Sequence, residues 1–293
     1  MSNQFDEKYK SYLAYFENEL VKYCNENLIT TPEILGDSMR YTLLLGGKRV
    51  RPVLMFAVGD ILGVEKEKLL PFAIALELIH TYSLIHDDLP EMDDDGYRRG
   101  KPANHKVYGQ GNAVLAGDGL LNSAYSLLFS ECFKGNEYVS AAKYICDCAG
   151  IFGMIAGQSA DLKYENSQPD ENILNYIYEN KTAKLLIAAV VVPSIFKSGE
   201  SFSKLHALGK SLGYLFQLTD DILDVCGNFS DTGKSLGKDD NAGKLTAVRL
   251  YGLDDCKLRA DIVGDNCLKI IDGLKGDCSF LYEFINFLKS RLG

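Results

Sequence analysis

The sequence predicts an all-α protein built as one large helical bundle, and two observations lead to this prediction. The first is that apolar residues recur at spacings of three and four along most of the chain, which is typical of helices with one buried face. The spacing is clear near the start of the chain, in Tyr9, Leu13, Phe16, Leu20 and Tyr23. The second is that the sequence lacks a series of short alternating runs bounded by hairpin signals. No Pro/Gly/Ser-rich linker divides residues 1–293, so we expect a single domain.

Breaks in the helical pattern give the expected order of elements. We expect helices at residues 6–27, 32–45, 53–62, 71–89, 114–133, 138–154 and 172–192, then a helix that carries FQLTDDILDV, and two or three more towards the carboxyl end. Pro71 is suited to a first helical turn, because the first N–H groups of a helix have no intrahelical acceptor. Pro90 is expected to end or kink the same helix.

Composition and charge limit the kinds of function. The chain has 46% hydrophobic and 24% charged residues, and its net charge of -9 argues against nucleic acid as a partner, which needs a broad basic field. No apolar segment reaches about 18 uncharged residues and no secretory leader is recognisable, so we expect a cytoplasmic protein without a transmembrane segment. The eight cysteines are scattered, which favours reduced thiols over disulfides or a zinc site.

The stretch IHTYSLIHDDLPEMDDDGYRRG concentrates carboxylates at the end of an apolar helix. On a straight helix Asp87 and Asp93 would point to different sides, but a bend at Pro90 lets them converge. Carboxylate oxygens without nearby cysteines suit Mg²⁺, whose shell is usually completed by water and substrate phosphates. Arg98 and Arg99 add planar groups suited to phosphate oxygens. Taken alone, the stretch is equally consistent with a solvated acidic helix end.

A second acidic segment, FQLTDDILDV, favours the functional interpretation. Four residues at i, i+4, i+7 and i+11 form one polar stripe on an otherwise apolar helix: Gly213, Gln217, Asp220 and Asp224. Carboxylates on a largely buried helix repel one another unless cations hold them. Two such clusters facing each other across a cleft would hold a diphosphate through bridging Mg²⁺.

These motifs make the sequence resemble the short-chain trans-polyprenyl diphosphate synthases of the farnesyl and geranylgeranyl type, particularly their bacterial farnesyl branch. The two aspartate-rich motifs of that family are similar to DDLPEMD followed by RRG, and to DDILD. Further matches, in order, are GGKRVRP from Gly46, Gly157-Gln158 with Asp161, Lys181-Thr182, and Lys234 and Lys238 in a Gly-rich segment. The resemblance implies an isoprenoid-synthase bundle with a central substrate cavity, and Mg²⁺-assisted joining of isopentenyl diphosphate to an allylic diphosphate.

The resemblance also assigns roles to individual residues. Those expected to hold Mg²⁺ are Asp87, Asp93 and Asp220, and those expected to give outer-sphere support are Asp88, Asp221 and Asp224, since adjacent aspartates on a helix diverge by about 100°. Those expected at isopentenyl diphosphate are Lys48, Arg49, His80 and Arg99; Lys48, Arg49 and Arg51 all follow a Gly-Gly bend that is well placed to meet a diphosphate. Those expected at the allylic diphosphate are Arg98, Lys181, Thr182, Gln217, Lys234 and Lys238. Lys181 is also expected to act in catalysis together with the three metal-binding aspartates.

The chain departs from the family pattern at two places. Ala183 stands where glycine usually follows the Lys-Thr pair, so we expect a gentler helix kink there. KLTAV, from Lys244, stands where a Lys-Ser-Thr-Tyr-Pro run is usual.

Product length and assembly are further implications of the resemblance. The family limits chain length at the fourth and fifth residues before the first aspartate, here Ser83 and Tyr82. Ser83 is small, so Tyr82 should form the floor of the tail channel and make farnesyl diphosphate the main product, with geranylgeranyl diphosphate as the alternative. We expect a homodimer, because the helices at residues 6–27 and 114–133 are apolar and because members of the family are predominantly homodimers.

Two other functions stay open at this point. A terpene cyclase would carry an Asn/Ser/Glu metal motif in place of the second aspartate-rich one. A non-catalytic subunit of a heteromeric synthase would typically lack one of the two motifs. Both motifs are complete in this sequence.

Overall fold

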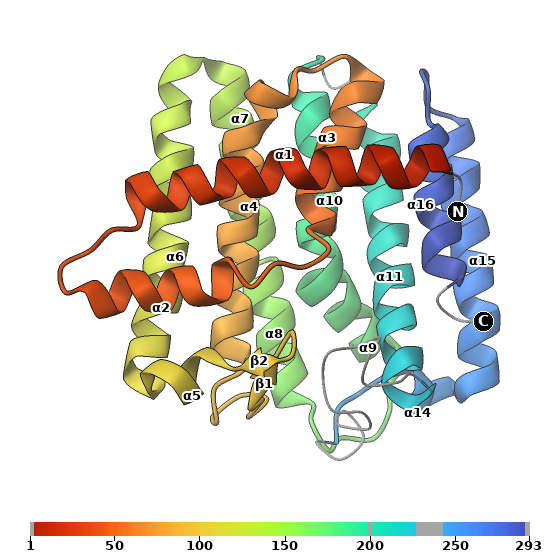
Figure 1. The fold of residues 1–293 in the computed structure, drawn as a ribbon. Coiled ribbons are helices and arrows are strands. Elements are labelled where there is room, and N and C mark those ends of the chain that lie inside the picture. The colour runs from red at the N-terminus through yellow and green to blue at the C-terminus, as the bar shows by residue number, and fades with distance from the viewer. Residues whose placement is uncertain (1–2, 199–200, 227–242, 291–293) are drawn as a thin grey trace.

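The computed structural model describes residues 3–198, 201–226 and 243–290, and in these ranges it is built almost entirely of helices (Figure 1). The first part contains α1 (Asn3–Asn27), α2 (Glu33–Leu43), α3 (Val50–Leu62), α4 (Lys66–Asp87), α5 (Asn104–Tyr108), α6 (Gln110–Glu131) and a 3₁₀ turn (Cys132–Lys134). The second part contains α7 (Asn136–Ala149), α8 (Met154–Lys163), α9 (Glu171–Ile177), a π-helix (Tyr178–Ala183), α10 (Lys184–Ile195) and α11 (Phe202–Cys226). The last part contains α14 (Ala247–Tyr251), α15 (Leu253–Asp272) and α16 (Ser279–Ser290). The predicted all-α fold class is confirmed.

A small antiparallel ribbon is the exception to the all-helical expectation. β1 (Tyr97–Arg98) pairs with β2 (Lys101–Pro102), with Arg98 opposite Lys101. The turn between them contains Arg99 and Gly100, whose φ angles are 53° and 75°. Left-handed backbone at both turn positions reverses the chain within two residues. The ribbon thereby carries two of the arginines of the predicted site.

The core of the bundle is centred on α10. Its residues 185–194 are all buried, and a helix that is apolar on every side belongs inside a protein. It packs against α3, α7 and α11, while α4 packs against α3 and α6, and α15 packs between α11 and α16. In Figure 1 the long helices stand roughly side by side with α1 crossing them, and the ribbon, α8, α9 and α14 lie towards one end of the bundle.

Two segments are long and apolar enough to cross a membrane by length and composition alone, Lys66–Asp87 and Asn136–Lys163. The first is α4, and 67% of its most apolar window is buried inside the bundle. The second is interrupted, since α7 ends at Ala149 and α8 begins at Met154. Core helices of folded proteins pass the same test, so burial in the bundle accounts for the apolar length of α4.

Several helix boundaries differ from the sequence expectation. α4 begins at Lys66, so Pro71 lies inside the helix and not in its first turn; the carbonyl that this proline leaves unbonded belongs to the exposed Glu67, where water can satisfy it. α3 begins at Val50, three residues earlier than expected. The helix expected at residues 138–154 is two helices. A Cβ on Gly153 would lie 2.1 Å from the Cys148 carbonyl oxygen, so the tight turn between them requires glycine.

The helix expected at residues 172–192 consists of α9, the π-helix and α10 in succession. The π-helix contains Lys181 and Thr182, so an interruption at this pair is confirmed. Ala183 does not prevent it, because Gly213 of α11 lies directly against this residue. A Cβ on Gly213 would be only 2.2 Å from the Ala183 Cβ, so the missing side chain at 213 makes room for the methyl group at 183.

Candidate active site

The first aspartate-rich segment folds back on itself where α4 ends. α4 stops at Asp87, and the Asp93 N–H donates to the Asp87 carbonyl oxygen at 2.8 Å. Pro90 therefore ends the helix and does not merely kink it. Burial raises the pKa of Asp87, Lys181 lowers it, and the nearby charge of Asp93 raises it again. The charges of Asp93 and Lys181 both act on Asp87, while the joint binding of Mg²⁺ by Asp87 and Asp93 stays a prediction.

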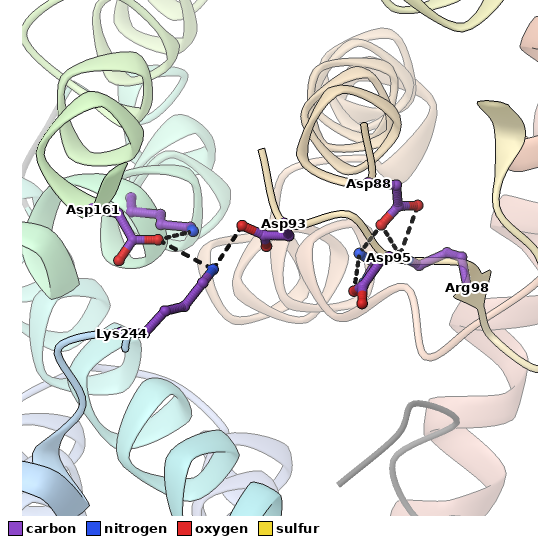
Figure 2. A network of polar contacts seen from close by, with 7 residues as sticks. Asp88, Asp93, Asp95, Arg98, Asp161 and Lys244 are labelled. Carbon is purple, nitrogen blue, oxygen red and sulfur yellow. Dashed lines mark hydrogen bonds and ion pairs between the residues drawn. The ribbon is translucent and has the colours of Figure 1, made fainter. Parts of the chain in front are cut away.

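Arg98 anchors this loop from the β-ribbon (Figure 2). Its Nε donates to both oxygens of the buried Asp88, at 3.0 and 3.2 Å, and its Nη2 contacts Asp88 and, at 3.5 Å, Asp95. Arg98 was expected at the allylic diphosphate, but the structure turns one edge of its guanidinium to Asp88, because a buried carboxylate needs a charge partner. A role of Arg98 at the allylic diphosphate stays a prediction. Asp88 supports the site through Arg98.

Lys244 lies between Asp93 and Asp161 (Figure 2), and Lys181 also contacts Asp161. Lys181 Nζ donates to Asp161 Oδ2, while Lys244 Nζ donates to Asp93 Oδ1 at 2.7 Å and lies 3.5 Å from Asp161 Oδ2. Burial alone would lower the pKa of Lys181, but the charges of Asp87 and Asp161 raise it above its usual value. The two ammonium groups are cations that neutralise this acidic cluster.

Sequence reasoning did not place Asp161 or Lys244 in the site. The signal for Asp161 was its position four residues after Gly157, which puts both residues on one face of α8. Gly157 lets that face approach the π-helix, since a Cβ on this residue would be 2.0 Å from the backbone nitrogen of Lys181. Lys244 was noted only as the start of KLTAV, and its pairing with Asp93 had no local signal because the two residues lie 151 positions apart along the chain.

The second aspartate-rich segment is divided between solvent and core. Asp220 is exposed and Asp224 is half-buried, whereas Asp221 is buried. Asp221 accepts hydrogen bonds from the Tyr178 hydroxyl and, at 2.7 Å, from the Ala247 N–H. It therefore ties α11 to the π-helix and to the start of α14. The outer-sphere support of a metal expected from Asp221 stays a prediction.

Gln217 and Thr182 join the same network. Gln217 Nε2 donates to Asp221 at 2.9 Å, and Gln217 Oε1 accepts from Thr182 Oγ1 at 2.6 Å. The structure thus brings together two residues that were expected at the allylic diphosphate and that lie 35 residues apart. Lys234 and Lys238, expected at the same substrate, lie outside the described residues.

Cationic groups gather around His80 on α4. Burial and the charges of four arginines, Arg51 first and then Arg99, lower the pKa of His80 well below its usual value, so the imidazole is neutral near pH 7. Burial likewise lowers the pKa of Arg51 to about 10, and Glu77 and Asp220 oppose this. Arg51 Nε is buried and has no hydrogen-bond partner among the described residues. It is a donor aimed at no protein acceptor, in a positive environment suited to an anion.

Two further cations are Lys48, on the Gly-Gly bend, and Arg99, in the turn of the β-ribbon. Lys48 is exposed on the Gly-Gly bend, and Arg99 donates to the carbonyl oxygen of Gly46. A Cβ on Gly47 would lie 2.7 Å from the Arg99 guanidinium carbon, so the bend lies directly against this arginine. The charge of Arg99 acts on both Arg51 and His80. The role of Lys48 at isopentenyl diphosphate stays a prediction.

Arg49 was predicted to bind isopentenyl diphosphate, and the structure corrects this. Its side chain is 0% exposed and donates to Glu17 at 2.7 Å, to Glu77 at 2.7 Å and to the Leu43 carbonyl oxygen at 2.6 Å. The backbone at Arg49 is left-handed, with φ 44°, and the guanidinium is committed to these buried acceptors. Arg51, which the sequence placed at the same bend without assigning it to a named substrate, has a buried Nε with no hydrogen-bond partner among the described residues.

The residues expected to limit chain length lie deeper along α4. Tyr82 is buried, its ring centroid lies 5.7 Å from that of His86, and its hydroxyl has no hydrogen-bond partner in the described part of the chain. His86 contacts the Val114 carbonyl at 3.0 Å, so this face of α4 looks towards α6. Ser83 is half-buried and lies one turn before Asp87, on the same face of α4 as that aspartate. The two residues thus occupy different sides of α4, and their effect on product length stays a prediction.

The carboxylates of the two aspartate-rich segments are the candidate ligands for Mg²⁺. Among the described residues no group of three or more His, Cys, Asp or Glu side chains forms a ready-made metal site. Asp87 and Asp93 nevertheless supply the hard oxygens that Mg²⁺ prefers, and one or two carboxylates with water and phosphate complete its shell. Lys181 and Lys244 already lie as cations among these acids. The residues fit a metal that binds together with a diphosphate, with Asp220 as the ligand expected from α11.

Known proteins similar to this chain identify its family. A family model described as polyprenyl synthetase matches residues 32–271. The chain is 40% identical over 283 residues to a farnesyl diphosphate synthase of Bacillus subtilis (strain 168), covering 94% of each chain. It is 44% identical over 234 residues to geranylgeranyl pyrophosphate synthase 3 of Arabidopsis thaliana, covering 77% of this chain and 65% of that one. A solved geranyltransferase of Helicobacter pylori, complexed with magnesium and isoprenyl diphosphate, has a similar fold with a TM-score of 0.85 and 32% identity, covering 100% of this chain and 98% of that one. The family match spans most of the chain and both aspartate-rich motifs, so this chain belongs to the polyprenyl synthetase family.

Proposed function

We propose that this chain is a trans-prenyltransferase that condenses isopentenyl diphosphate with dimethylallyl and geranyl diphosphate to give farnesyl diphosphate. The proposal rests on two groups of charged residues in one bundle, one made of carboxylates and lysines and the other of arginines. Carboxylates with lysines, at Asp87, Asp93 and Lys181, suit a diphosphate that arrives with a metal. Arginines around the neutral His80 suit a diphosphate that binds without one. A reaction that joins two diphosphate substrates needs one site of each kind.

The charge groups suggest how the reaction proceeds. When bound, Mg²⁺ would neutralise the charge that builds on the leaving diphosphate. The allylic C1–O bond breaks and its electron pair goes to that diphosphate, beside the fixed positive charge of Lys181. The double bond of isopentenyl diphosphate then attacks C1, and the released diphosphate accepts the proton that is lost. His80, neutral near pH 7, can donate one N–H to isopentenyl diphosphate without adding charge.

Farnesyl diphosphate is proposed as the main product because Tyr82 is a large buried side chain one turn before His86. A geranylgeranyl product is the alternative, since relatives bearing that name are similar in identity to those named for farnesyl diphosphate. We propose a cytoplasmic location and a homodimer as well. The dimer is supported by large apolar side chains exposed on or next to α6, namely Val114, Leu115, Phe129 and Phe133, which a second copy would cover.

A turnover assay tests the proposed function. Purified protein with isopentenyl and geranyl diphosphate should release diphosphate and form farnesyl diphosphate, and chelation of Mg²⁺ should stop the reaction. Asp87→Asn should lower turnover at least roughly a hundredfold, given the several kcal/mol that metal charge stabilisation supplies. Asp147→Asn, at an exposed ion pair on α7, is the matched control and should leave the rate unchanged. Activity that appears only when another subunit is added would favour the non-catalytic subunit instead.

A further inference from the structure

Glu77 is a buried carboxylate in the middle of the arginine group. It lies on α4 three residues before His80, so Glu77, His80 and Asp87 share one helix face. It is 1% exposed, and its Oε1 accepts from Arg49 Nη1 at 2.7 Å. Its Oε2 is buried without a hydrogen-bond partner among the described residues. Burying a carboxylate costs desolvation free energy unless the charge is well paired. We therefore expect Glu77 to have a role beyond packing.

The charge of Glu77 reaches three guanidinium groups at once. Burial lowers the pKa of Arg51 and Arg99, and the charge of Glu77 opposes that effect. The pKa of Arg49 is raised although the residue is buried, because Glu77 and Glu17 stabilise its charge. Arg51 and Arg99 also repel each other, because each lies within the field of the other. Glu77 is thus an anion that holds several like charges in one buried place before any substrate binds.

Arg49 connects Glu77 to the backbone of the Gly-Gly bend. Its φ and ψ are 44° and 42°, a left-handed conformation that is unfavourable for a residue with a side chain. The hydrogen bonds to Glu17, Glu77 and Leu43 hold it there. Arg49 directly precedes α3, so its backbone sets the direction in which Lys48 leaves the bend and in which Arg51 enters the helix.

We propose that Glu77, acting through Arg49, is a positioning residue for the isopentenyl diphosphate subsite. The Glu77–Arg49 pair keeps the bend in its left-handed form and thereby directs Lys48 and Arg51 to the same diphosphate. This inference rests on the proposed function, but it gives Glu77 no contact with either substrate.

The test is Glu77→Gln, which keeps the shape of the side chain and removes its charge. The KM for isopentenyl diphosphate should rise about tenfold, while the KM for geranyl diphosphate and kcat at saturating substrates stay within about twofold. Calorimetric titration of isopentenyl diphosphate alone should show the same loss of affinity. Removing an anion without disturbing the bend would strengthen diphosphate binding, so a lower KM for isopentenyl diphosphate overturns the proposal.

Further variants separate positioning from a purely structural role. Glu67→Gln, an exposed carboxylate on the same helix, should leave both KM values unchanged. Arg49→Lys keeps the positive charge but cannot bridge Glu17, Glu77 and Leu43, and it should show the same selective rise; it decides the question if Glu77→Gln does not fold. Equal rises in both KM values, or no rise in an active variant, overturn the proposal. An inactive wild type would instead contradict the proposed function.

Discussion

Replacing Lys244 by methionine should make the stability of the protein depend more strongly on Mg²⁺. Lys244 Nζ lies 2.7 Å from Asp93 Oδ1 and 3.5 Å from Asp161 Oδ2, and the side chains of these three residues are 12%, 16% and 7% exposed. Methionine keeps most of the length of the lysine side chain and removes its charge. In the metal-free protein the two carboxylates would then lose a cation that neutralises them.

The contacts give the size of the expected effect. At 2.7 Å and an effective dielectric constant of about 20, the attraction between Lys244 and Asp93 is about 6 kcal/mol before desolvation is counted. Removing one partner of a buried pair costs about 3–5 kcal/mol, and Asp161 keeps Lys181, so we expect the lower end, about 3 kcal/mol. With an unfolding entropy of about 2.1 cal/mol/K per residue over 293 residues, this lowers Tm by about 5 °C.

Scanning calorimetry with EDTA, and again with Mg²⁺ and inorganic diphosphate, measures the effect. The Lys244→Met protein should recover most of the lost stability when Mg²⁺ and diphosphate are added, because ligands that bind the folded state stabilise it. Lys143→Met is the control. Its pair with Asp147 is exposed on both sides and contributes about 0.5 kcal/mol, so Tm should shift by less than about 1 °C. An equal loss of Tm in both buffers would refute the reasoning.

Three further predictions address the tail channel, the assembly and the thiols. Tyr82→Ala should lengthen the main product, as seen by chromatography of dephosphorylated products; an unchanged distribution at retained activity would assign length control to another residue. Light scattering should give the mass of two chains, and Phe133→Asp, at a side chain 89% exposed, should give one; an active monomeric wild type would contradict the dimer. Burial raises the pKa of Cys148 and Cys267 to about 12, so at pH 8 only about one part in ten thousand of each is thiolate. A disulfide reagent should therefore label the exposed Cys226 first, and rapid labelling of Cys148 or Cys267 in the folded protein would contradict their burial.

Local signals in the sequence determined the fold class and the place where α4 ends in the first aspartate-rich loop. Spacings of three and four predicted the helices because one face of each is buried, and this periodicity is a property of neighbouring residues. Pro90 predicted the end of α4, since a proline cannot continue the hydrogen-bonded ladder. The Lys181-Thr182 pair marked the interruption that the structure shows as a π-helix. Each of these features is encoded within a few residues of the place where it acts.

Only the tertiary structure decided which charged residues are available to a substrate. Arg49 and Arg51 have the same chemistry and lie two residues apart, yet Arg49 is taken up by Glu17 and Glu77, which lie 32 and 28 residues away along the chain. In the same way, Lys244 reaches Asp93 across 151 residues. Whether a cation is paired depends on burial and on partners from other helices, and no local spacing records either. The sequence alone could therefore name the residue types of the site. The packing of α1, α4 and α8 decided which of these charged residues are paired within the protein and which can face a substrate.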